Sequence, residues 1–121
     1  MMPDPDAVAR AALRILPSLG VEPRVSVAAI RIALREADHL TDDVYDAPAA
    51  LLFALGRYPR CFSGFRAMSV LVVEWHATTL GFKLEATRGE LASMLGEVAR
   101  REIEFEAVRT WFGARLLPFG G

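Results

Sequence analysis

The chain has 121 residues, of which 53% are hydrophobic, and this combination fits one globular domain with a single core. The formal net charge is −1, so no overall positive field attracts nucleic acid or a membrane surface. A single cysteine excludes an internal disulfide and fits a reducing compartment. Because residues 1–6 do not resemble a secretory signal and no apolar run reaches about 20 residues, we expect a cytoplasmic protein without a membrane span.

Three helices are predicted in the first half of the chain. Apolar residues recur at helical spacing over residues 8–19, and Asp4 or Asp6 can cap this helix. A second apolar stripe covers residues 27–37. A third helix is expected from near residue 48, where a proline suits the first turn, to residue 56 or 58.

The fourth predicted helix is the most apolar. It runs from residue 66 to about residue 80 and is apolar on nearly all sides, which is typical of a helix buried at the centre of a domain. Within it, Trp75 is interpreted as a core residue and His76 as a packed or hydrogen-bonded histidine. Trp111, further along the chain, is also assigned to the core.

The last third of the chain predicts one extended segment and two more helices. Residues 82–86 alternate between apolar and polar types, and Thr87–Glu90 fits a capping box that starts a fifth helix. A sixth apolar stripe covers residues 105–116, and residues 118–121 are expected to form a tail. The sequence therefore predicts a single all-α domain over residues 1–121, a bundle of about six helices around one central apolar helix.

The most informative segment is the run from Tyr58 to Arg66, which lies within a stretch, residues 47–73, that carries three arginines and no acidic side chain. Ser63 and Gly64 stand where a helix is expected to begin, and backbone N–H groups at such a place can hold a phosphate. The planar guanidinium of Arg66 suits the same ligand. The alternatives are that Ser63 only caps the helix and that the arginines are solvated at helix ends.

Residues 44–112 resemble the Fic/Doc family, in particular its short death-on-curing (Doc) branch. The family signature is His-Pro-Phe-x-Asp/Glu-Gly-Asn-Lys/Gly-Arg, and residues 58–66 here read Tyr-Pro-Arg-Cys-Phe-Ser-Gly-Phe-Arg. Pro59 and Arg66 match this signature. The helix before the run and the segments after it are also similar to the family, whereas residues 1–40 show little likeness.

The resemblance implies a transferase that moves AMP, or in Doc toxins a phosphate, from a nucleoside triphosphate with Mg²⁺ onto a protein hydroxyl. The family histidine activates that hydroxyl, and the family acid holds the cation. Tyr58 and Phe62 stand at these two positions. Tyrosine is almost fully protonated at neutral pH, and phenylalanine offers no oxygen ligand to a cation. The resemblance leaves Ser63, Gly64 and Arg66 as phosphate-binding residues. Arg57 and Arg60 are supporting basic residues.

Cys61 offers a different chemistry. Arg57, Arg60 and the start of the next helix can lower the pKa of its thiol and make it a nucleophile. The alternative is that this cysteine is a small buried hydrophobe. An acidic cluster with a histidine at residues 38–46 is explained by an exposed helix end and a turn, so we assign no metal ligands.

Three functions are open at this point. The first is a degenerate Fic/Doc protein of the toxin–antitoxin type, with impaired or lost transfer, that acts by binding an antitoxin, another protein or a nucleotide. The second is a divergent but active transferase that modifies a protein hydroxyl. The third is a helical protein-interaction module without nucleotide binding, in which the resemblance reflects the fold alone. We favour the first.

Overall fold

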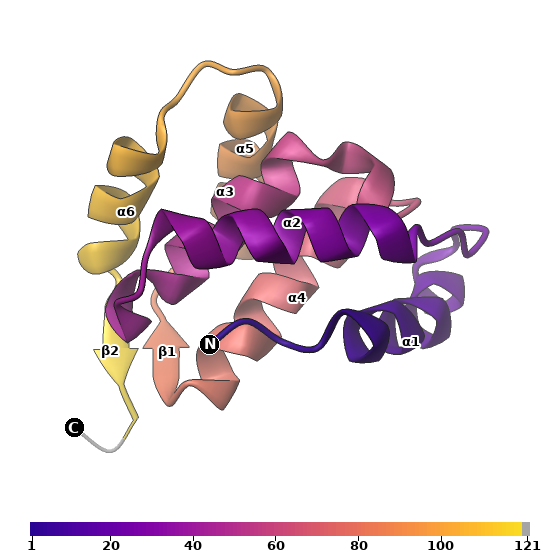
Figure 1. Ribbon diagram of the computed structural model, residues 1–121, viewed down its shortest axis with the longest axis horizontal. Helices are drawn as coiled ribbons and strands as arrows, with labels where there is room; N and C mark the ends of the chain where they lie inside the picture. Colours follow the sequence, from indigo (N-terminus) through magenta and orange to yellow (C-terminus); the bar gives the residue numbers. More distant parts are fainter. Residues whose placement is uncertain (120–121) are drawn as a thin grey trace.

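The computed structural model describes residues 1–119, and six α-helices make up most of this part (Figure 1). The α-helices are α1 (Pro5–Ile15), α2 (Val27–Leu40), α3 (Ala47–Arg57), α4 (Phe65–Thr79), α5 (Arg88–Ala99) and α6 (Phe105–Gly113). Short 3₁₀ turns are η1 (Leu16–Leu19), η2 (Val44–Asp46) and η3 (Pro59–Cys61). The predicted all-α bundle of about six helices is confirmed. No helix in this described part is both long enough and apolar enough to cross a bilayer.

Side-chain caps fix where several helices begin. The carboxylate of Asp4 accepts a hydrogen bond of 3.0 Å from the N–H of Ala7 and starts α1. Ser26 does the same for α2, with a bond of 3.1 Å from the N–H of Ala29. The predicted capping box at Thr87–Glu90 is present in both directions and starts α5.

The helix at the centre of the bundle is α3, not α4 as predicted. Every residue from Ala47 to Gly56 is buried, and α3 packs against α2, α4, α5 and α6. Both helices are apolar on most sides, but α3 is rich in alanine, which lets four neighbours approach it closely. In contrast, α4 keeps one side open, and Trp75 on that side is 47% exposed. The assignment of Trp75 to the core is therefore wrong, and Trp111 is only half-buried.

A short sheet closes the end of the chain. Strands β1 (Phe82–Leu84) and β2 (Leu116–Pro118) pair antiparallel, with Phe82 opposite Pro118 and Leu84 opposite Leu116. This pair lies beside α6, on the side of the molecule away from α1 (Figure 1). The extended segment after α4 is confirmed. The prediction that the sixth helix continues to residue 116 is wrong, because α6 ends at Gly113 and the chain turns into β2, and Pro118 belongs to a strand rather than to a tail. Residues 120–121 of the expected tail lie outside the described part.

The contact between α3 and α5 yields a stability prediction. A Cβ at Gly56 would lie 2.6 Å from Cγ1 of Val98, a side chain that is itself buried, so neither helix can yield easily. We expect Gly56→Ala to lower the free energy of unfolding by about 1–3 kcal/mol through overpacking. The matched control is Gly113→Ala, where the added Cβ meets no atom within 4 Å, and we expect this change to be neutral or stabilising. Urea unfolding followed by circular dichroism measures both, and equal midpoints would contradict this account of the helix contact.

Candidate functional site

Residues 58–66, which we call the signature-like loop, are hydrogen-bonded through their backbone to the segment before α2. The N–H of Ser26 donates to the carbonyl of Cys61 at 3.0 Å, and the N–H of Ser63 donates to the carbonyl of Arg24 at 2.9 Å. Between these two bonds, Val25 and Phe62 form an isolated antiparallel bridge. This loop is therefore held like a strand against residues 22–26.

Ser63 makes the closest part of this connection. Its hydroxyl donates to the carbonyl of Glu22 at 2.7 Å and accepts from the N–H of Arg24 at 2.9 Å. The alternative that Ser63 caps α4 is wrong, because Gly64 occupies the N-cap position and no side chain caps this helix. Gly64 has a φ of +59°, and a Cβ there would lie 3.2 Å from Val21, so glycine suits both the conformation and the space.

The two positions where the resemblance places the base and the metal ligand are used by the fold itself. The hydroxyl of Tyr58 donates a hydrogen bond to the carboxylate of Glu36 on α2. This hydrogen bond, together with partial burial, raises the pKa of Tyr58, which moves the phenol further from a general base. Phe62 is 3% exposed and packs in the core. Neither side chain supplies the chemistry that the resemblance places at its position.

The structure places Cys61 in the core rather than at the surface. The residue is fully buried, and burial raises the pKa of its thiol to about 11. This is the opposite of the shift that a nucleophilic cysteine needs, so the small-hydrophobe interpretation holds for this residue.

The basic residues of the predicted site have different neighbours. Arg66, in the first turn of α4, extends its guanidinium over Gly96 of α5. Arg57 lies over the ring of Phe53, 5.5 Å from its centre, and Arg60 is exposed at η3. The structure therefore brings Gly64 and Arg66 to the start of one helix, whereas the side chain and N–H of Ser63 are bonded to residues 22–24. A phosphate site at these residues stays a prediction.

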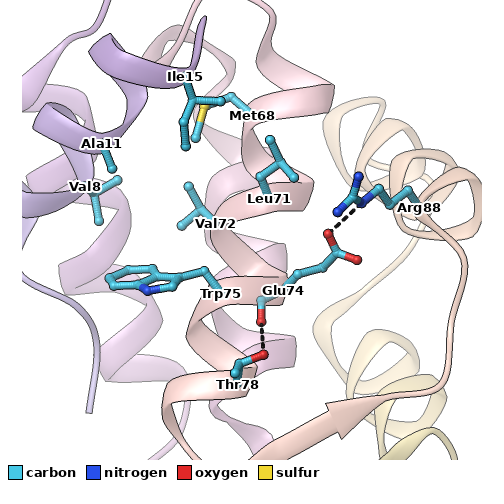
Figure 2. A pocket seen from close by; sticks show the side chains of 10 residues that line it. All are labelled: Val8, Ala11, Ile15, Met68, Leu71, Val72, Glu74, Trp75, Thr78 and Arg88. Carbon is cyan, nitrogen blue, oxygen red and sulfur yellow. Dashed lines mark hydrogen bonds and ion pairs between the residues drawn. The ribbon is translucent and has the colours of Figure 1, made fainter. Parts of the chain in front are cut away.

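An open apolar groove lies between α1 and α4, and the sequence did not indicate it. The groove has a volume of about 480 Å³. Its lining residues are Val8, Ala11 and Ile15 of α1, Met68, Leu71, Val72, Glu74, Trp75 and Thr78 of α4, and Arg88 of α5. Figure 2 shows the apolar side chains from both helices facing this space, with the carboxylate of Glu74 bonded to Arg88 at its rim. The distance of this ion pair is 2.8 Å. The only signal for the groove in the sequence is the excess of apolar residues on α4, which predicts burial instead.

Two buried polar atoms lie on the covered side of α4. Within the described residues, the Oγ of Ser69 and the Nε2 of His76 have no hydrogen-bond partner. His76 is 2% exposed, as expected for a packed histidine. The pKa of His76 is lowered to about 4, mainly by burial and also by the charge of the N-terminus, while Asp38 opposes both effects. The neutral imidazole is therefore the form that the folded protein accepts.

Comparison with known proteins gives no family for the chain: no family model matches it, and no curated protein sequence matches it. A function must therefore be inferred from the geometry of the signature-like loop and of the groove.

The burial of His76 yields a pH prediction. Its pKa is about 4 in the folded state and 6.5 for an ordinary histidine, so the unfolded chain binds the proton first. Stability is therefore complete above pH 6.5 and falls as the pH approaches 4, by up to about 3 kcal/mol. Urea unfolding between these pH values should show this loss in the native protein and not in His76→Leu. Parallel pH profiles for the two proteins would contradict the assignment, because the carboxylates titrate in both.

Proposed function

We propose that this protein is a Fic/Doc-like scaffold that has lost transferase chemistry and acts by binding a helical segment of another protein. The observation that carries the proposal is a contrast between two surfaces. At the signature-like loop, Tyr58 is bonded to Glu36 and Phe62 is buried, so side chains at the catalytic positions stabilise the fold. Between α1 and α4, in contrast, an apolar surface that includes Trp75 is open to solvent.

The groove suits an amphipathic helix. Two helices form its walls, its lining is almost entirely apolar, and its polar groups stand at the rim as the Glu74–Arg88 pair (Figure 2). A helix that lays its apolar side into such a groove buries side chains spaced three and four residues apart. A small molecule of the same volume needs several polar groups that converge on it, and this lining provides few.

The proposed setting depends on the resemblance. A Doc-like chain of the toxin–antitoxin type has a small antitoxin as its partner, and a helical segment of such a protein is our first candidate for the groove. We place this binding in the cytoplasm, and the single free thiol of Cys61 supports a reducing compartment.

Site-specific crosslinking tests the groove. Ala11 and Leu13 are both exposed on α1, but only Ala11 lines the groove, so the two positions form a matched pair. With a photoreactive phenylalanine analogue at residue 11, we expect one protein to be crosslinked in the cells that make this chain, through a segment with helical apolar spacing. The same analogue at residue 13 should not capture it.

The captured protein is then purified and titrated against two variants. We expect Ala11→Glu to weaken binding at least about tenfold, because it places a charge against an apolar partner surface, and Leu13→Glu to change it less than about twofold. Equal capture at both positions, or equal loss in both variants, would rule out the groove as the binding site.

Nucleotide binding is the second candidate, and the position of Gly64 and Arg66 at the start of α4 favours it. This candidate expects ATP with Mg²⁺ to raise the melting temperature of the native protein and not that of Arg66→Ala. A thermal shift assay over a range of ATP concentrations measures this. If ATP leaves the native protein unchanged, the phosphate site is excluded, and the groove proposal is unaffected.

A further inference from the structure

Six arginines gather at one end of the bundle, where α3 and α5 end and α4 begins. The two helix ends are adjacent, because Gly56 of α3 lies against Val98 of α5. The arginines come from five segments, and we call this surface the arginine end. Its members are Arg24, Arg57, Arg60, Arg66, Arg100 and Arg101.

Contacts link these arginines into one surface. Nη2 of Arg66 and Nη1 of Arg100 each lie 3.0 Å from the point where a Cβ of Gly96 would stand, so the two guanidinium groups converge there. Arg24 and Arg60 line one shallow cleft of about 410 Å³. Arg60 also lines a second cleft, again of about 410 Å³, together with Arg57. Arg101 follows Arg100 directly at the end of α5.

Most of this charge is not neutralised by the protein itself. Within residues 1–119, Arg100 pairs with Glu102, and the other five members of the arginine end take part in no ion pair. Like charges that are held close together repel each other. In a chain with a net charge of −1, such a concentration of unpaired arginines indicates a surface that an anionic partner completes.

The composition of the surface selects the kind of anion. Carboxylates lie among the arginines, because Glu36 bonds to Tyr58 next to Arg57 and Glu102 pairs with Arg100. They repel a nucleic-acid backbone, which carries a charge at every nucleotide, more than a peptide whose separate carboxylates can avoid them. Among the described residues, the exposed aromatic side chains are Tyr45, Trp75 and Phe119, and none belongs to a segment of the arginine end. Tyr58 and Phe65, which do, are half-buried and packed against the core, so bases find little aromatic surface for stacking. The shallow clefts also offer no enclosed pocket for a single small anion.

We propose that the arginine end binds an extended acidic segment of a partner protein, whose separate carboxylates pair with Arg24, Arg60 and Arg66. A guanidinium binds a carboxylate through two parallel hydrogen bonds, and carboxylates on a flexible segment can match arginines that are spread over several elements. This surface is distinct from the apolar groove, and binding here does not depend on the groove.

Fluorescence anisotropy with a defined probe tests the proposal. The probe is a short fluorescein-labelled peptide of alternating glutamate and serine, and its control replaces each glutamate by glutamine. We expect the acidic peptide to bind and the glutamine peptide not to bind. Affinity for the acidic peptide should fall roughly tenfold or more when salt is raised from about 50 to about 300 mM.

A charge-matched pair of variants locates the site. The triple variant Arg24→Gln, Arg60→Gln, Arg66→Gln should lose at least about tenfold in affinity for the acidic peptide. The control variant Arg10→Gln, Arg14→Gln, Arg35→Gln removes the same charge from exposed positions on α1 and α2 and should lose less than about twofold. All six side chains are exposed, and melting curves verify that both variants fold.

Other outcomes overturn the proposal. Equal losses in the two triple variants would mean that only the overall charge matters. Tighter binding of a single-stranded oligonucleotide of equal length would assign the surface to nucleic acid, and binding of ATP without binding of the peptide would assign it to a nucleotide. Absence of binding for every probe would also refute it. Because Ala11→Glu leaves the arginine end unchanged, failure here and failure of the groove proposal are separate results.

Discussion

The burial of α3 on all sides is the constraint on which the rest of the structure depends. Its small side chains admit four neighbouring helices, and the contact of Gly56 with Val98 leaves no room for a larger residue. All four neighbours pack apolar side chains against α3. One side of α4 is therefore covered only partly by α1, and the groove is the surface that remains. The same burial fixes the signature-like loop at the end of α3, where the arginines gather.

The local features of the fold could be predicted from the sequence, whereas the choice of the central helix could not. Helical spacing, Asp4 and the capping box at Thr87 act within one or two turns, so their signals are visible in the chain itself. Which of two apolar helices lies at the centre depends on how many neighbours each side can admit. Strand β2 was missed because Leu116, four residues after Phe112, continues a helical spacing that the turn after Gly113 interrupts.

The candidate site shows the same limit. The resemblance to the Fic/Doc signature places Tyr58 and Phe62 where the family has its base and its acid, but the sequence does not show what these two side chains contact. The acceptor for Tyr58 is Glu36, 22 positions earlier, and the acceptor for the Ser63 hydroxyl is Glu22, 41 positions earlier. Nearby arginines favour an activated thiol at Cys61, yet burial, which depends on the whole core, sets its pKa in the opposite direction.

The connection through Ser63 also has a consequence for how the molecule opens. Hydrogen bonds join Ser63 to Arg24, 39 positions earlier, so the chain between them, which contains α2 and α3, forms a loop whose two ends are held together. The two helices inside this loop, α2 and α3, share the most extensive packing in the bundle, so we expect the loop to open together with this helix pair. The segment at residues 58–66 is thus held in place by the fold, and we expect the hydrogen-bonded amide proton of Ser63 to exchange with solvent as slowly as those of the core helices.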